Sequence, residues 1–117
     1  MTGVQTCALP ISIVLLKQEF LHRRAPLTHG GVLGQVWREG TRQANLARLV
    51  PAIDIIPLDA NLGARAGRLL GKARRDDVID AALVLLAADG DMVLTSDARD
   101  LEPLAAVAGL HIDIVSV

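Results

Sequence analysis

Two groups of aspartates are the part of this sequence best suited to chemistry. The first, Asp76-Asp-Val-Ile-Asp80, begins an otherwise apolar stretch that is predicted to be helical. Residues three apart share a helical face, so Asp77 and Asp80 can point the same way. The second, Thr95-Ser-Asp97, directly follows a hydrophobic stretch predicted to be a strand. Ligands of open α/β sheets bind beyond the carboxyl ends of strands, where Asp97 is expected.

Carboxylates that share a pocket repel each other unless a cation neutralises them. Hard divalent cations such as Mg²⁺ or Mn²⁺ prefer oxygen ligands, and they can activate water for attack on a phosphate. An acidic cleft in a nearly neutral protein is therefore compatible with nucleic-acid cleavage. Spacing alone does not establish this chemistry.

Each aspartate also has a purely structural explanation. Asp76 and Asp77 can cap a helix, because carboxylates are favoured at helix N-termini. Asp80 can pair with a buried arginine, since an unpaired carboxylate in an apolar helix is costly. Asp97 or Asp100 can cap the next helix, with Pro103 in its first turn.

The composition indicates one compact α/β domain without a disulfide framework. The chain has 117 residues, 51% of them hydrophobic and only 2% aromatic, which suits a core of Leu, Val, Ile and Ala. Its single cysteine excludes disulfides and a cysteine-based zinc site. No apolar run approaches the roughly 20 residues of a membrane helix, so we expect a cytoplasmic protein. Because the net charge is −1, nucleic-acid binding would need local arginine clusters or bridging metal ions.

The hydrophobic pattern predicts strands alternating with helices. Helices are expected over residues 12–24, 30–38, 41–50, 61–73, 77–86 and 101–108, and strands over 52–59, 92–95 and 111–117, with a short extended piece at 26–29. The helix over 77–86 is apolar nearly all round, as a helix covered on both sides would be. This alternation predicts an α/β fold with a mainly parallel sheet and helices on both faces.

Residues 1–11 resemble the translation of a sequencing adapter along their whole length. The alternative interpretation of these residues is an ordinary N-terminal strand, but a match along the whole segment favours the adapter. We therefore exclude the segment from fold reasoning and give its Cys7 no functional weight. We also expect the natural protein to have been longer, with a partial domain over 12–117.

From Pro26 to Val117 the chain resembles the PIN-domain family, in particular its VapC-like toxins. The resemblance is carried by the stretches Val32-Leu-Gly-Gln-Val-Trp-Arg38, Arg42-Gln-Ala-Asn-Leu-Ala-Arg48, Asp77-Val-Ile-Asp-Ala81 and Val93-Leu-Thr-Ser-Asp97. It implies a three-layer α/β/α, Rossmann-like nuclease that holds Mg²⁺ or Mn²⁺ between acids at the carboxyl edge of the sheet. It also implies an endoribonuclease toxin of a type II toxin–antitoxin pair, with an RNA substrate, a cognate antitoxin and a possible homodimer.

The resemblance assigns roles to individual residues. Asp80 and Asp97 match the family's metal-binding acids, with Asp77 and Asp100 as helpers. Gln35 stands where many relatives have a glutamate, so it can orient a water or a ligand but adds no charge. Arg38 and Arg42 are candidates to hold RNA phosphates; they are equally compatible with solvated arginines on a helix.

The sequence departs from the family at its front. The family's first strand ends in an aspartate that is central to the metal site, and no acid precedes Glu19 here. We therefore expect the first strand to be missing or replaced, with weak metal binding and impaired cleavage.

Two other functions are weighed against the nuclease. The first is a PIN-like module that binds RNA or protein without cleaving. The second is a receiver-like domain phosphorylated on Asp97, which is disfavoured because only one predicted strand follows that residue. The histidines His22, His29 and His111 lack metal-ligand spacing. Trp37 is expected to be a core anchor, and Ser96 has no histidine placed to activate it.

Overall fold

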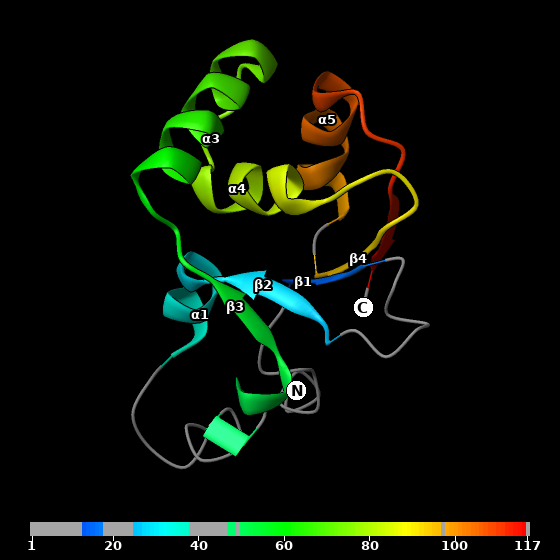
Figure 1. The fold of residues 1–117 in the computed structure, drawn as a ribbon. Helices are drawn as coiled ribbons and strands as arrows, with labels where there is room; N and C mark the ends of the chain where they lie inside the picture. Colours follow the sequence, from blue (N-terminus) through cyan, green and yellow to red (C-terminus); the bar gives the residue numbers. More distant parts are fainter. Residues whose placement is uncertain (1–12, 18–24, 38–46, 49, 97, 117) are drawn as a thin grey trace, which may run out of the picture.

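Five short strands form one sheet at the centre of the protein (Figure 1). The computed structural model describes residues 13–17, 25–37, 47–48, 50–96 and 98–116. The strands are β1 (Ile13–Leu16), β2 (Leu27–His29), β3 (Asp54–Ile56), β4 (Met92–Thr95) and β5 (Asp113–Ser116). Their order across the sheet is β3-β2-β1-β4-β5, so β1 lies in the middle.

The central strand runs against all the others. β2 pairs with β3 in parallel and β4 pairs with β5 in parallel, whereas β1 is antiparallel to both β2 and β4. In this register Leu15 lies opposite Leu27 on one side and Val93 on the other. The sheet is therefore mixed, and the prediction of a mainly parallel sheet was wrong.

The helix predicted over 12–24 was also wrong where the structure describes it, because residues 13–16 form β1. That prediction placed Ile13, Leu16, Phe20 and Leu21 on one helical face and did not count the two apolar residues between Ile13 and Leu16. Val14 and Leu15 are themselves buried, at 8% and 0% exposure. A strand covered on both faces reads as an unbroken apolar run, which periodicity cannot distinguish from a short helix.

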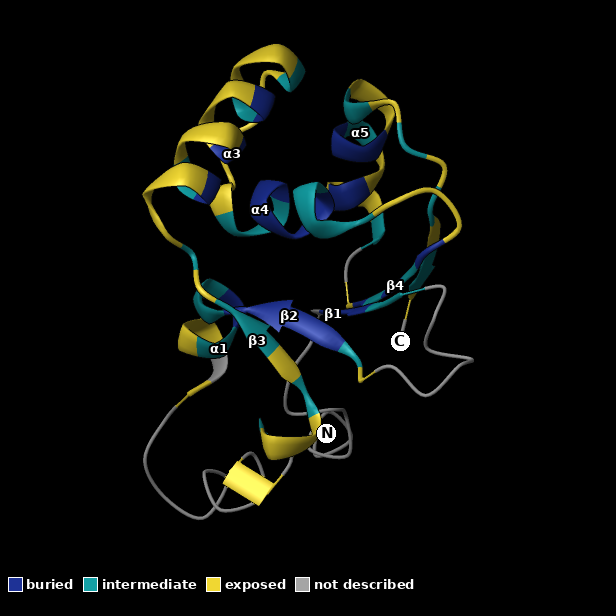
Figure 2. Ribbon diagram, in the orientation of Figure 1, coloured by how far each residue is buried: buried dark blue, intermediate teal, exposed yellow. Residues whose placement is uncertain are grey.

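Three helices pack together over one face of the sheet (Figures 1 and 2). They are α3 (Ala60–Ala73), α4 (Val78–Leu86) and α5 (Ala98–Ala108). A shorter helix, α1 (Gly30–Val36), lies at the end of β2. Within the described residues no second helical layer covers the opposite face, so the structure does not show the three-layer arrangement. None of the described helices is long and apolar enough to cross a membrane.

Most other predicted elements are confirmed with shifted boundaries. The helices over 61–73 and 77–86 correspond to α3 and α4, and the strand over 92–95 is β4. The strand predicted over 52–59 is only β3, because Val50–Ala52 forms a 3₁₀ turn and Asp59 caps α3. The helix expected from Leu101 begins at Ala98, which places Pro103 inside it. The final strand is confined to Asp113–Ser116.

The core lies between the sheet and the three-helix layer, where Figure 2 shows buried residues on α4, α5 and β2. Leu15 and Val93 of the sheet and Leu83 of α4 are fully buried. Leu101 and Leu104 of α5 are also buried, and they pack in the same cluster. Among the described residues the buried cluster consists of Leu, Val and Ala, with partly buried Ile side chains packed against it, as the composition predicted.

Candidate functional site at the carboxyl edge of the sheet

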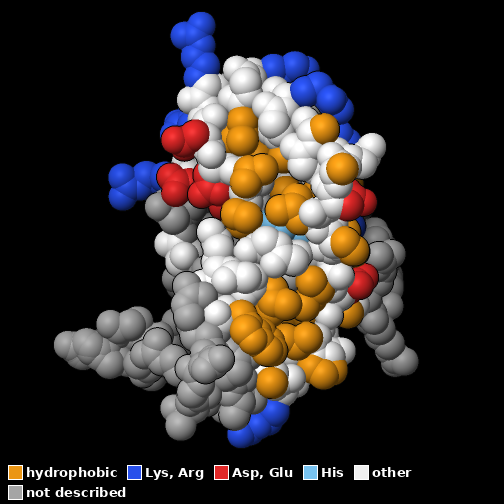
Figure 3. Space-filling view, turned by 90° about the vertical axis from the view of Figure 1, so that its left-hand side faces the viewer, with side chains coloured by type: hydrophobic (Ala, Val, Ile, Leu, Met, Phe, Trp, Pro, Cys, Tyr) orange, Lys and Arg blue, Asp and Glu red, His pale blue; other side chains and the backbone are white. Residues whose placement is uncertain are grey.

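The carboxyl ends of four strands meet at one edge of the sheet. Because β1 alone is reversed, β2, β3, β4 and β5 all end on the same side, and β1 begins there. The ends of β2 and β3 lie at the left of Figure 1, and Figure 3 views the molecule from that side. Acidic side chains gather on one side of the upper half of this face (Figure 3).

Asp77 and Asp80 begin α4 at this edge. Asp77 is the N-cap residue, and its Oδ1 accepts a hydrogen bond from the Asp80 backbone N–H at 3.1 Å. The structural explanation of Asp77 as a cap is thus confirmed. Asp80 lies one turn further on, in the first turn of the helix, and is half-buried while Asp77 is exposed. Placing a carboxylate near this helix N-terminus is favourable, because the helix dipole stabilises negative charge there.

The other candidate residues are only partly described. Ser96 follows β4 and is exposed, while Asp97 lies outside the described residues. Asp100 is exposed in the first turn of α5, and Gln35 is exposed near the end of α1. Arg38 and Arg42 also lie outside the described residues.

The described residues alone do not complete a metal site. No three of their histidine, cysteine, aspartate or glutamate side chains are grouped closely enough to hold an ion. Asp77, Asp80 and Asp100 therefore do not form a three-acid group of this kind. A cation would need a further donor, and Asp97 is the predicted one.

A buried histidine joins three elements next to Asp80. His29 is fully buried at the end of β2, and its Nε2 donates to the carbonyl of Ile79 in α4 at 2.8 Å. Its Nδ1 accepts from the Gly31 N–H at 3.0 Å and so caps α1. One nitrogen donates and the other accepts, so the ring is neutral. Burial lowers its pKa below 6.5, against a smaller raising effect of the bond to Ile79.

A second buried polar group lies at the opposite edge of the sheet. Lys17, just after β1, forms an ion pair of 2.7 Å with Asp91, just before β4. The Lys17 ammonium also donates to the Leu86 carbonyl at 3.0 Å, and the Asp91 carboxylate accepts from the Ala88 N–H at 2.7 Å. The pair was not predicted from the sequence, because neither residue belongs to a motif. The signal available in the sequence was a charged residue directly before a hydrophobic stretch, and the structure shows that this residue, Asp91, is buried.

The described cavity lies away from the aspartates. It has a volume of about 430 Å³ and lies between α5 and β5, where apolar side chains such as Leu110, Ile112 and Ile114 line it together with polar groups. Its two ionisable side chains are Glu102 and His111, and none of the predicted site residues lines it. Trp37, expected in the core, is 44% exposed, so that prediction was wrong.

No protein family model, curated protein sequence or solved structure matches the chain.

Proposed function

We propose that this protein is a metal-dependent endoribonuclease of the PIN type, a toxin of a toxin–antitoxin pair, whose cleavage is weak. The observation that supports the proposal best is Asp80, a half-buried carboxylate in the first turn of α4 at the carboxyl edge of the sheet. Asp77 is the N-cap of this helix, and Asp80 lies three residues further on, where the helix dipole also favours a carboxylate. A half-buried carboxylate at the carboxyl edge of the sheet is also the kind of oxygen ligand that a hard divalent cation prefers.

In this proposal Asp80 and Asp97 hold one Mg²⁺ or Mn²⁺ ion. Asp77 and Asp100 act as helpers that contact the ion through water. One oxygen of Asp77 is already engaged as the helix cap. Gln35 orients a ligand without adding charge, and Arg38 and Arg42 hold backbone phosphates. When bound, the ion would generate hydroxide and stabilise the charge that builds on a phosphate.

The orientation of β1 gives a reason for weak activity. β1 begins at the carboxyl edge of the sheet, whereas the other strands end there. Its four residues, Ile-Val-Leu-Leu, include no acid. The strand at the centre of the sheet thus adds no carboxylate to the edge where Asp80 lies. A cation there would have fewer charged ligands, and its affinity would be correspondingly low.

The test is cleavage of a labelled single-stranded RNA in Mn²⁺ by the purified chain. We expect slow cleavage that stops in EDTA and falls more than about 10-fold in Asp80→Asn, since weakening a metal site typically costs at least that much activity. The matched control is Asp113→Asn, which removes an exposed carboxylate from the start of β5 at the opposite edge. Equal rates for the Asp80→Asn variant and the unmodified chain would overturn the proposal.

The second candidate is a PIN-like module that binds RNA or a partner protein without cleaving. It is favoured by one observation, that no three acids are grouped within the described residues. Calorimetric titration with Mn²⁺ separates the two functions. The nuclease requires binding heat that disappears in Asp80→Asn, and the binding module predicts no such heat.

A further inference from the structure

A row of positively charged side chains covers α3 and the turn that follows it. The residues are Arg65, Arg68, Lys72, Arg74 and Arg75, and all five side chains are exposed. They make up five of the 12 lysines and arginines of a chain whose net charge is −1. We call these five residues the α3 basic surface.

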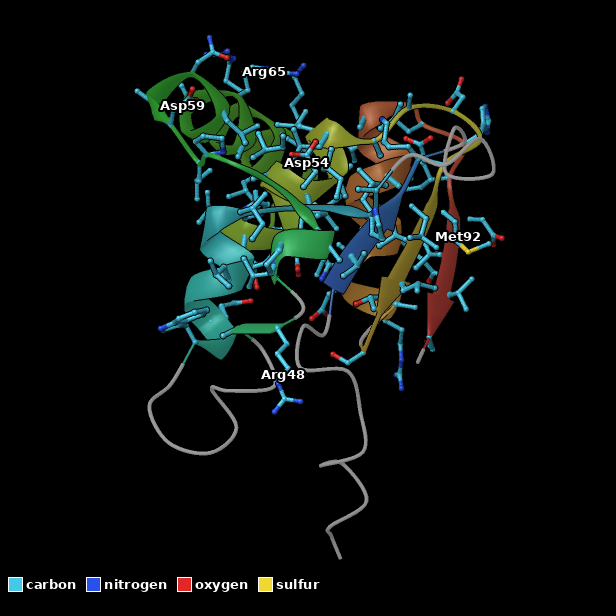
Figure 4. The ribbon with its side chains drawn as sticks, turned by 60° about the horizontal axis from the view of Figure 1, so that its bottom comes forward. Arg48, Asp54, Asp59, Arg65 and Met92 are labelled. Atoms are coloured by element: carbon cyan, nitrogen blue, oxygen red, sulfur yellow. The ribbon has the colours of Figure 1, made fainter. Side chains whose placement is uncertain are left out.

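Helical geometry sets three of these charges in a line. Arg65, Arg68 and Lys72 are spaced by three and four residues, so they share one face of the helix. Leu62, Ala66 and Leu69 form the buried face. At about 1.5 Å per residue the row is roughly 10 Å long before the turn extends it. Figure 4 shows Arg65 pointing outward from α3, and Figure 3 shows lysine and arginine side chains at the upper end of the molecule.

The charges of the α3 basic surface are not neutralised within the described part of the chain. No ion pair or side-chain hydrogen bond there involves any of the five residues. The Arg74 and Arg75 backbone N–H groups both donate to the Leu70 carbonyl, which closes the helix without using their side chains. These guanidinium groups are therefore available to a ligand.

Arg74 occupies a backbone position that favours glycine. It follows the last turn of α3 with φ 56° and ψ 47°, in the left-handed region, and it is the only described non-glycine residue with positive φ. An L-residue there is less stable than glycine by about 1 kcal/mol. The charge of Arg74 is itself favourable at this end of the helix, because the helix dipole places partial negative charge there, and the exposed side chain adds to the positive surface.

The surroundings of the row suit a polyanion better than a folded protein. The large exposed apolar side chains of the described chain are Trp37, Val78 and Val107, and none of them lies on α3. The centres of protein interfaces usually combine arginine with large aromatic or aliphatic side chains. Instead, the exposed Gly67 and Gly71 leave open space beside the row, where an added Cβ would meet nothing within 4 Å. A sugar–phosphate backbone could approach closely there, and arginine forks match phosphate oxygens in pairs.

We propose that the α3 basic surface binds the phosphate backbone of a single RNA strand and takes no part in cleavage. The choice of phosphate groups as the ligand is argued from the exposed positive charges of this surface. The choice of RNA rests on the proposed function. The surface would hold substrate whether or not Asp80 binds metal.

The experiment measures binding of a fluorescent single-stranded RNA by anisotropy, in EDTA and in the Asp80→Asn background, so that cleavage plays no part. At about 0.1 M salt, the double variant Arg65→Gln/Arg68→Gln should bind roughly 20-fold more weakly, and the slope of log affinity against log salt should fall by about 1.4. Arg65→Lys/Arg68→Lys should keep most of the affinity. The charge control is Arg48→Gln, an exposed arginine outside α3, which Figure 4 also labels.

Arg74→Gly separates ligand binding from folding. We expect RNA affinity to fall about 5-fold, while the urea midpoint of unfolding stays the same or rises. The proposal is overturned if the Arg65→Gln/Arg68→Gln variant binds like its parent, or if Arg48→Gln loses as much affinity per charge. Equal competition by duplex DNA would remove the preference for RNA, and equal competition by polyglutamate would point to an acidic protein partner instead. Either result overturns the proposal, and neither bears on whether Asp80 supports cleavage.

Discussion

His29 is a side chain whose charge state decides how three elements meet. Its ring must be neutral to donate to Ile79 of α4 and to accept from Gly31 of α1 at the same time. Protonation would turn Nδ1 into a donor that faces the Gly31 N–H. A histidine without metal-ligand spacing is thus a structural residue next to the candidate site.

This geometry makes stability depend on pH. The pKa of His29 is lowered by burial, so between 6.5 and the folded-state pKa the unfolded chain takes up a proton that the native ring does not. The contribution of neutral His29 to the free energy of unfolding is therefore complete above about pH 6.5, and it falls as the pH drops below that value. Urea unfolding at about pH 7.5 and pH 5.5 should show the loss.

The control for this prediction is the exposed His111, whose replacement by glutamine should leave the pH dependence intact. His29→Gln should lower stability by about 1 to 3 kcal/mol and remove most of the pH dependence in this window. An unchanged pH profile in His29→Gln would contradict the assigned role.

At the residue scale, the sequence was informative where a side chain acts locally. Asp77 could be predicted as a cap because capping depends on neighbours in sequence. The Lys17–Asp91 pair could not, because it forms only once β1 has paired with β4. Asp97, Arg38 and Arg42 lie outside the described residues, so their roles remain predictions.

At the scale of elements, the Lys17–Asp91 pair fixes β1 against β4. The side chain of Asp91 is 2% exposed and that of Lys17 is 15% exposed, so the pair is largely removed from water. Lys17 follows Leu16, whose register partner Met92 follows Asp91. The antiparallel register therefore brings the two charges to the same end of the strand pair.

Removing one partner leaves the other charge buried. Lys17→Met should destabilise the protein by about 3 to 5 kcal/mol, measured by urea unfolding. The matched control Lys72→Met removes an exposed lysine of α3 and should change stability little. The double variant Lys17→Met/Asp91→Asn should recover part of the loss, because no uncompensated charge remains. A single variant as stable as the control would show that the pair does not hold β1.

The elements best predicted from the sequence are those with a long periodic pattern or a cap. α3 and α4 combine apolar residues at helical spacing with an aspartate cap, and both were found. β1 was missed because four consecutive apolar residues fit a strand or a helix equally well. Its place in the sheet decides between the two, and that place depends on β4, far along the chain.

At the scale of the whole molecule, β1 is the link between two parallel strand pairs. Hydrogen bonds join β2–β3 to β4–β5 only through this strand, among the residues that the structure describes. Its Leu15 is fully buried in the core cluster. The two halves of the sheet should therefore unfold together.

Leu15→Ala tests this coupling. The cavity it leaves should lower the free energy of unfolding by about 2 to 5 kcal/mol. Trp37, the only tryptophan, reports on the end of α1, and far-ultraviolet circular dichroism reports mainly on the helices. Both probes should shift to the same lower urea midpoint. Separate midpoints would mean that the halves of the sheet unfold independently.

The reversed strand also determines the order in which the chain can reach its native state. β1 is synthesised long before its partner β4, and the pairing of Ile13 with Thr95 closes a loop that spans most of the chain. Closing a long loop carries an entropic penalty that nearby contacts, such as those between α3 and α4, largely avoid. The helical layer can therefore assemble early, and the strand at the centre of the sheet enters late. Until then the four apolar side chains of β1 lack their native packing partners and are exposed to water. Misfolding or chaperone binding would therefore begin at this segment.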